Sequence, residues 1–171
     1  KLIILLLSTI LIFLFLYLFY KNLEAKKNIE IAEKYTKALI LVKQKKTDES
    51  KILLENVISK DHKFYSPLAL YLIIDNNLEN DQSKIISFFD EILKNNSIDK
   101  ENLNLIKIKK ALYLINFDNE KLILETLNPV INSNSVWRNT AINLISTYFL
   151  EKKQKAKAEE YIQLLDNSNN K

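Results

Sequence analysis

The stretch ALYLINFDNEKLILETLNPVI, residues 111–131, consists of an apolar helix end, a polar turn and a second amphipathic helix. Three other stretches share this layout: ALILVKQKKTDESKILLENVI at 38–58, ALYLIIDNNLENDQSKIISFFDEIL at 69–93 and LISTYFLEKKQKAKAEEYIQLL at 144–165. Apolar residues recur at helical spacing in each of them, and the segments between them show no strand-like alternation. The four stretches therefore predict an all-α protein built from helix pairs.

The spacing of these stretches indicates a repeat. Ala38, Ala69 and Ala111 open three of them and are 31 and 42 residues apart, which scatters around the ~34-residue period of tetratricopeptide helix pairs. The chain contains no glycine, so the glycine expected in the first helix of a standard repeat is missing and the repeats are degenerate. We expect a tetratricopeptide-like solenoid of about four helix pairs with a concave binding surface. An irregular helical bundle is the alternative.

Capping residues predict where the helices begin. The predicted starts are Thr47 or Asp48, Ser66 before Pro67, Asn80 or Asp81, Asp99, Asp118 and Ser135. We expect Pro129 to limit the helix that Asp118 opens, because the residue before a proline avoids the α region. Two of the stripes expected to be buried are Ile29, Ala32, Thr36, Leu39 and Val42, and Leu105, Ile108, Leu112 and Ile115.

The first residues differ in character from the rest. Residues 2–20, LIILLLSTILIFLFLYLFY, contain no charge, and at ~1.5 Å per residue a helix of this length spans the ~30 Å hydrocarbon core of a bilayer. A cleaved signal peptide would have a shorter apolar region and a small-residue cleavage site, whereas this run ends in FYKNLEAKK. We predict an uncleaved transmembrane anchor at 1–21, a helical domain at 22–167 and a polar tail at 168–171.

The orientation of this anchor stays open. From Lys21 to Lys46 there are eight lysines and three glutamates, an excess that favours keeping this side cytoplasmic. The chain begins at Lys1 and has no methionine, so we expect further residues to precede it. The charges of these preceding residues are needed, because orientation is decided by comparing the positive charges on the two sides of the anchor.

The composition excludes several kinds of site. Without cysteine the chain has no disulfide, thiol nucleophile or thiolate metal site, and without glycine it has no phosphate-binding loop of the Walker or dinucleotide type. One histidine, His62, cannot form a multi-histidine metal site, and we interpret it as a solvated loop residue. Glu24, Glu30 and Asp75 would be the candidates for a membrane-bound hydrolase, but a solvated helix face explains them better. The sequence therefore offers no candidate catalytic residue and no candidate metal site.

The charge pattern does not favour nucleic acid, and no motif in the sequence points to a small-molecule substrate. The net charge is +4, but the lysines are mixed with Glu and Asp along the predicted helices and no arginine cluster is present. Tyr35, Tyr65 and Tyr71 are the candidate contacts for a protein partner, because tyrosine is common at binding hot spots. Packing in the core is the competing explanation for each of them.

The stretch NSVWRNTA, residues 134–141, holds the only tryptophan and the only arginine. Trp137 shares a helical stripe with Ala141 and Tyr148, so we expect it to pack between neighbouring helix pairs. Arg138 stands near a helix N-terminus, where a cation gains nothing from the helix dipole. We expect it to reach a carboxylate or the helix-end carbonyls of the preceding pair, so that Trp137 and Arg138 form a structural staple.

From the anchor to Leu165 the chain resembles the YfgM-like tetratricopeptide proteins of bacterial inner membranes, ancillary subunits of the Sec translocon, and in particular their alphaproteobacterial members. The anchor followed by NIEIAEKYTKAL, FYSPLALYLI and LIKIKKALYLI carry this resemblance. NSVWRNTAINLI is the most specific part, since it is similar to the Trp-Arg that opens the penultimate helix in this group. The departures are the missing glycines at tight helix turns, and Lys, Asn and Ile where relatives carry Ala and Leu.

The resemblance implies a single-pass inner-membrane protein with a short cytoplasmic N-terminus and a periplasmic helical domain. It also implies a non-catalytic adaptor without a cofactor, which binds the SecYEG translocon and the periplasmic chaperones that receive secreted chains. A cytoplasm-facing anchored tetratricopeptide adaptor in envelope biogenesis is the alternative, and the lysine-rich stretch after the anchor is its best support. Topology separates the two.

Overall fold

The computed structural model describes the backbone of residues 2–166 and the side chains of Leu6 and of residues 10–165. Within this part of the chain all regular elements are α-helices, which confirms the predicted all-α class. The chain divides into two compact units, the first ending at Asp81 and the second beginning at Gln82. The predicted polar tail lies outside the described residues.

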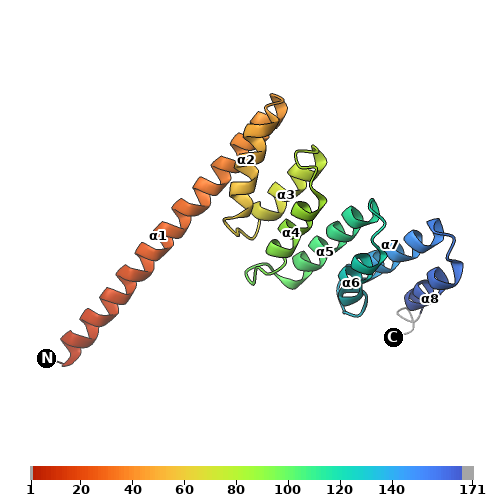
Figure 1. The fold of residues 1–171 in the computed structure, drawn as a ribbon. Coiled ribbons are helices and arrows are strands. Elements are labelled where there is room, and N and C mark those ends of the chain that lie inside the picture. The colour runs from red at the N-terminus through yellow and green to blue at the C-terminus, as the bar shows by residue number, and fades with distance from the viewer. Residues whose placement is uncertain (1, 167–171) are drawn as a thin grey trace. The chain divides into compact units, whose positions relative to one another are not determined.

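Among the described residues, three helices belong to the first unit and five to the second; Figure 1 labels them. They are α1 (Leu2–Lys43), α2 (Thr47–Ile58) and α3 (Tyr65–Asp75), and then α4 (Gln82–Ile92), α5 (Lys100–Ile115), α6 (Glu120–Ile131), α7 (Arg138–Glu151) and α8 (Lys155–Asp166). Each of three predicted helix pairs lies entirely within a single unit and consists of two packed helices. These pairs are α1 with α2 in the first unit, and α5 with α6 and α7 with α8 in the second. The pair predicted at 69–93 is divided between the two units.

The core of the first unit forms where the C-terminal part of α1 meets α2 and α3. Ala38 is fully buried, and the hydroxyl of Ser50 on α2 donates a 3.1 Å hydrogen bond to its carbonyl oxygen. The predicted stripe on this helix is wrong in part, because Ile29 is 58% exposed whereas Ile31 is 2% exposed. Three of its members, Ala32, Leu39 and Val42, are partly buried. Apolar residues occupy several faces of the helix here, and the contact with α2 selects the face that is buried.

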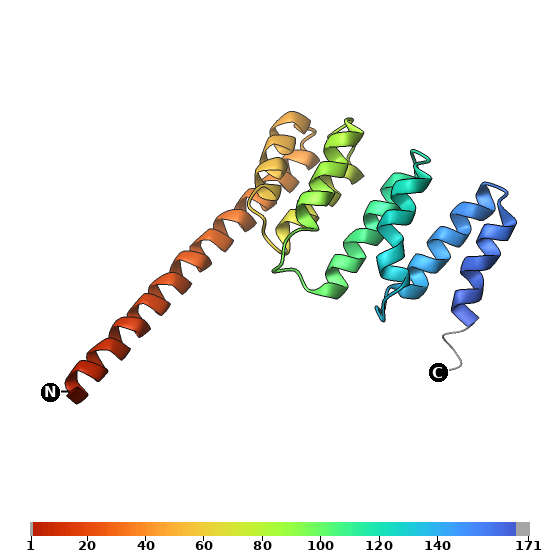
Figure 2. The ribbon, with the colours of Figure 1, turned by 60° about the horizontal axis from the view of Figure 1, so that its bottom comes forward.

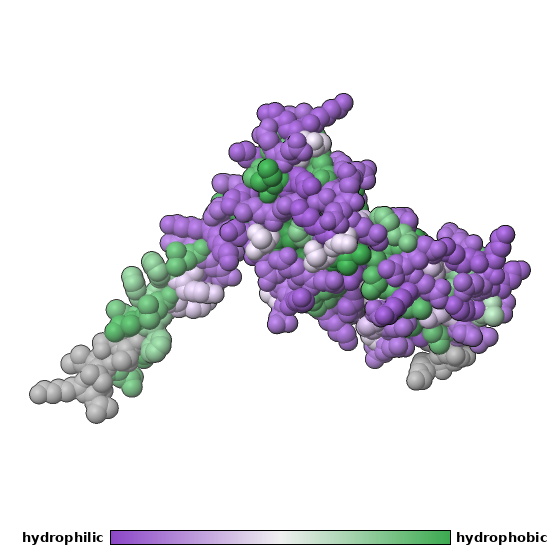
Figure 3. Space-filling model, in the orientation of Figure 1, coloured by the Kyte–Doolittle hydropathy of each residue, from purple (hydrophilic) through white to green (hydrophobic). Residues whose placement is uncertain are grey.

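Residues 10–20 of α1 make no contribution to this core. Residues 10–20 are all exposed on a helix that runs without a break to Lys43, and Figure 3 shows apolar residues gathered along it. Among the described residues, no helix meets the length and hydropathy that a membrane span requires. The side chains of residues 1–5 and 7–9, in the first half of the predicted anchor, lie outside the described part.

In the second unit, α6 packs against both α5 and α7, and α8 packs against α7; Figure 2 shows the succession of these helices. The core is continuous from α5 to α8 and includes three fully buried small side chains, those of Ala111, Ala141 and Ala158. The second predicted stripe is wrong in part, since Leu112 is exposed whereas Ala111 and Leu114 are buried. α4 adds Ile85, Phe89 and Ile92 to the buried residues of this unit.

The predicted helix starts hold at some positions and fail at others. α2 begins at Thr47, and α4 begins at Gln82, directly after Asp81. The Asp99 side chain caps α5 by accepting a 3.0 Å hydrogen bond from the Asn102 N–H. α6 is capped by Asn119 and not by Asp118. Pro129 lies inside α6, which continues to Ile131, because a proline in the last turn removes only one N–H donor from the helix.

Two serines also act differently from the prediction. Ser66 lies inside α3, which begins one residue earlier at Tyr65, and its buried hydroxyl hydrogen-bonds to the carbonyl oxygens of Val57 and Ile58. Ser135 precedes α7 by three residues; its Oγ accepts a bond from the Trp137 N–H and donates one to the Glu101 carboxylate. Both hydroxyls therefore bond to the preceding helices or loops of their own unit.

A residue with positive φ follows the first helix of every predicted pair. These residues are Lys45 (φ 60°), Asn77 (50°), Asp118 (55°) and Lys153 (59°), and Asp61 (51°) adds a fifth in the turn after α2. At the ends of α1, α3 and α7 the backbone closes with a six-residue hydrogen bond, from Lys46 to Leu41, Leu78 to Ile73 and Gln154 to Phe149. This is the Schellman arrangement, in which glycine normally supplies the left-handed residue.

Candidate protein-interaction surface

An aromatic cluster forms where the loop between α2 and α3, residues 59–64, meets α1. The ring centroids of Tyr35 and Tyr65 are 5.6 Å apart, and those of His62 and Tyr65 are 5.0 Å apart. Phe64 is 6.1 Å from His62 and is 58% exposed. We call Tyr35, His62, Phe64 and Tyr65 the aromatic cluster. It brings together two of the three tyrosines that the sequence singled out as partner contacts.

His62 holds the cluster in place. Its Nδ1 accepts hydrogen bonds from the backbone N–H groups of Phe64 (3.1 Å) and Tyr65 (3.2 Å), so it satisfies donors at the start of α3. Burial lowers the pKa of the imidazole, and the charges of Lys63 and Lys27 lower it further. His62 is a loop residue, as predicted, but the interpretation of it as solvated is wrong, because a partly buried neutral imidazole caps a helix here.

The third candidate, Tyr71, lies further along α3. Its side chain is partly buried, and burial raises the pKa of its phenol to about 12. Tyr35 is also partly buried, and burial is the first cause of the raised pKa of its phenol. Phe64 is more exposed than either, and sequence reasoning missed it. The run HKFY at 62–65, two aromatic residues beside a lysine and a histidine, was the signal that could have found it.

Trp137 and Arg138 lie in the second unit. Trp137 is partly buried against the core of this unit. The Arg138 guanidinium donates a 2.9 Å bond to the carbonyl of Ile131, the last residue of α6, and a 3.1 Å bond to the carbonyl of Leu164 in α8. A single side chain thus joins the ends of two helices to the start of α7.

The carboxylates considered for a hydrolase are all exposed. Lys34 hydrogen-bonds to Glu30 at 2.7 Å and lowers the pKa of its carboxyl, which is opposite to the raised pKa of a general acid. Among the described side chains, no three His, Asp or Glu residues are grouped so that they could bind a metal ion.

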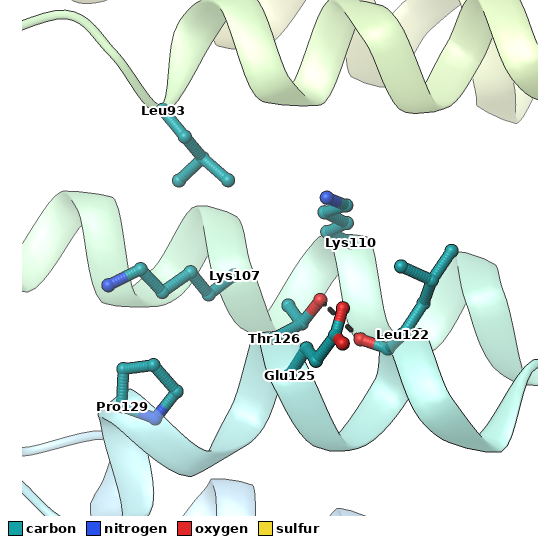
Figure 4. A pocket seen from close by; sticks show the side chains of 7 residues that line it. All are labelled: Leu93, Lys107, Lys110, Leu122, Glu125, Thr126 and Pro129. Atoms are coloured by element: carbon teal, nitrogen blue, oxygen red, sulfur yellow. Dashed lines mark hydrogen bonds between the residues drawn. The ribbon is translucent and has the colours of Figure 1, made fainter.

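A cleft of about 180 Å³ lies beside α5 and α6 (Figure 4). In this view Lys107 extends along it toward Pro129. The Nζ of Lys110, also on its wall, hydrogen-bonds to the Asp90 carboxylate at 2.6 Å, and the Thr126 hydroxyl donates to the carbonyl of Leu122 at 2.7 Å. These polar groups are bonded within the second unit and point to no particular ligand.

Comparison with known protein families, with curated proteins and with solved structures finds no match to this chain.

Proposed function

We propose that the chain is a membrane-anchored, non-catalytic adaptor, an ancillary component of the Sec translocon that links secreted chains to periplasmic chaperones. It would bind its partners through a tetratricopeptide-like array of helix pairs. The observation that carries this proposal is the continuity of α1. One helix contains both the exposed apolar run and Ala38, the buried residue of the first helix pair.

The exposed run supports anchoring on physical grounds. Its eleven large apolar side chains, residues 10–20, are each more than half exposed and surround the helix on all sides. An exposed apolar surface of this extent is rare on a soluble domain, and a helix that is apolar all round is normally buried in protein or in lipid. Tyr17 and Tyr20 close the run, where interfacial aromatic residues are expected.

The adaptor role rests on the repeated layout of the helix pairs. A fully buried small residue precedes the left-handed turn residue by seven or eight positions in three pairs: Ala38 and Lys45, Ala69 and Asn77, and Ala111 and Asp118. Repeated helix pairs of this kind serve as binding scaffolds in solenoid proteins.

The aromatic cluster indicates where a membrane partner would bind. Tyr35 is fifteen residues beyond Tyr20 on the same helix, a separation of about 22 Å along its axis. The extramembrane loops of a channel in the same bilayer can reach this height. Tyr35 and Tyr65 form an amphipathic aromatic surface of the kind that is frequent at binding hot spots.

Topology tests the proposal and its alternative. The chain has no cysteine, so Asn170→Cys provides a single reporter in the tail. We expect a membrane-impermeant maleimide to label this variant in intact cells with a permeabilised outer membrane. Labelling only after lysis would contradict the periplasmic role and favour the cytoplasm-facing adaptor, which the lysine excess after the run supports.

Photo-cross-linking tests the partner. A photoreactive amino acid at Tyr35 is expected to cross-link to a SecYEG subunit in intact cells, whereas one at Tyr113, a partly buried tyrosine of the second unit, serves as the matched control. Equal cross-linking yields at the two positions, or no SecYEG adduct at Tyr35, would contradict the assignment of the aromatic cluster as the translocon contact.

A further inference from the structure

The loop at 59–64 lies at the end of the first unit that faces the exposed apolar run. α2 runs antiparallel to α1: Ser50 bonds to Ala38, and further along α2 the Lys34 Nζ bonds to Asn56 at 3.1 Å. Each step toward the end of α2 is thus a step toward the N-terminus of α1. Both ribbon views show the turn after α2 on this side of the first unit (Figures 1 and 2).

The packing of α2 on α1 gives the height of this loop along α1, because Asn56 bonds to Lys34 and the loop begins three residues further on. Lys27 is close enough to lower the pKa of the His62 imidazole, and Lys60 contributes to the lowered pKa of the Glu30 carboxyl. Lys27 is seven residues beyond Tyr20, or about 10 Å along the helix. The polar headgroup layer extends ~5–7 Å beyond the hydrocarbon core, and charges act over a Debye length of ~8–10 Å.

Helix tilt brings the loop closer still. Packed helices lie 8–10 Å apart, and membrane-spanning helices tilt by about 20° on average. A tilt of this size toward α2 lowers the loop by about 3 Å. With this tilt the long side chains of Lys60 and Lys63 can extend to the headgroup layer without any change in the packing of α1 on α2.

The chemistry of this end of the unit suits an anionic lipid surface. Lysines predominate between the apolar run and the loop, all of them exposed: Lys21, Lys26, Lys27, Lys60 and Lys63. Glu24, Glu30 and Asp61 are the carboxylates in the same region, and Glu30 is paired with Lys34 at 2.7 Å. Phe64 is exposed, and the Lys63 Nζ lies 5.1 Å from its ring centroid.

We propose that the 59–64 loop is a second membrane contact, in which Lys60 and Lys63 bind anionic headgroups and Phe64 enters the interface. An aromatic residue beside lysines is the combination found at membrane surfaces. Two contacts, the apolar run and the loop, fix the tilt and the rotation of the first unit and so the direction in which Tyr35 and Tyr65 face. This inference rests on the proposed anchoring.

The test uses the full chain reconstituted into vesicles of phosphatidylcholine alone or with phosphatidylglycerol. Ser59→Cys carries a fluorophore at the loop, and Asn76→Cys carries it at the exposed end of α3. Spin-labelled headgroups quench a fluorophore that touches the surface. We expect quenching at position 59 that rises with the fraction of phosphatidylglycerol and falls in high salt, because salt screens the lysines, and little quenching at position 76.

Removing the lysine charges of the loop distinguishes a specific loop contact from a general attraction of the positively charged chain to anionic vesicles. Lys60→Gln with Lys63→Gln is expected to weaken the association of the loop with anionic vesicles about 25-fold, or about fivefold per lysine. The matched control, Lys43→Gln with Lys45→Gln, removes the same charge at the opposite end of α2 and is expected to change nothing. An equal effect of the two double variants would overturn the proposal.

The remaining outcomes distinguish the loop from the anchor. If the chain floats with neutral vesicles but the fluorophore at position 59 is not quenched in anionic ones, the loop proposal is wrong and the anchor stands. An acidic protein surface then becomes the better binding partner for the loop. If the chain does not float with neutral vesicles, the anchoring itself fails and the loop contact falls with it.

Discussion

At Arg138 a single guanidinium connects α6, α7 and α8 through the carbonyl oxygens of Ile131 and Leu164. Hydrogen bonds from a charged donor each contribute about 1.5–3 kcal/mol, and the planar fork of arginine reaches two acceptors that a lysine cannot reach together. This explains why one arginine is found here among lysines. The sequence predicts an acceptor at the end of the preceding helix pair, and Ile131 is such an acceptor. The acceptor in α8 depends on packing that a sequence does not show.

Arg138→Lys is expected to destabilise the second unit by about 1–2 kcal/mol, because one of the two bonds is lost. Trp137, the only tryptophan, reports the unfolding of this unit by fluorescence in urea. Lys109→Arg, an exposed exchange on α5 in the reverse direction, is the control and should leave the midpoint unchanged. An unchanged midpoint in Arg138→Lys would show that the two bonds do not hold the helices.

His62 makes the first unit sensitive to acid. Its Nδ1 accepts two backbone bonds, so the folded state favours the neutral imidazole and its pKa is lowered, by burial first. The unfolded chain binds a proton near pH 6.5, so stability is complete above this pH and falls as the pH drops through the lowered folded pKa. The sequence places His62 in a loop but does not show that its ring turns inward to cap α3.

We expect the melting temperature of the full chain, measured by circular dichroism in detergent, to decrease when the pH is lowered from 7 to 5. His62→Asn retains an acceptor oxygen but does not titrate, so it should remove part of this fall, while His62→Ala should lose about 1 kcal/mol at neutral pH. A His62→Asn variant with the full pH dependence would show that other groups cause it.

At the scale of the helices, residues other than glycine adopt the left-handed conformation in the turns, because the chain contains no glycine. Lys45, Asn77, Asp118 and Lys153 adopt positive φ, a conformation that costs a side chain with a Cβ atom about 1–2 kcal/mol. The helices and most of their limits follow from apolar periodicity and caps such as Asp99. The buried face of α1 does not, because apolar residues lie on several of its faces and only the partner helix decides between Ile29 and Ile31.

Lys153→Gly is expected to stabilise the second unit by about 0.5–1 kcal/mol, since glycine adopts positive φ without strain but loses more entropy on folding. The measurement is urea unfolding followed by Trp137 fluorescence. Lys153→Ala, which removes the same side chain but keeps the Cβ atom, should give no gain. Equal stabilisation by both variants would place the effect in the lysine side chain and not in the backbone.

For the whole molecule, the all-α class was predictable because helical periodicity is strong along the entire chain. The division between Asp81 and Gln82 was not, since the sequence groups the residues on both sides of it into one helix pair. The aromatic cluster was predictable only in part, because Tyr35 and Tyr65 are thirty residues apart in sequence and meet through the turn after α2. The central proposal at this scale is that the exposed half of α1 lies in a membrane.

The most direct measurement of that proposal is extraction of membranes from expressing cells with alkaline carbonate. We expect the full chain to stay in the membrane pellet. Leu11→Lys with Leu14→Lys should release it, because each charge near the centre of a membrane-spanning helix costs roughly 2.5–3.5 kcal/mol. Ile52→Lys with Val136→Lys, two exposed apolar residues outside the run, is the matched control and should remain in the pellet. Release of the unaltered chain by carbonate would contradict the anchor and, with it, the proposed function.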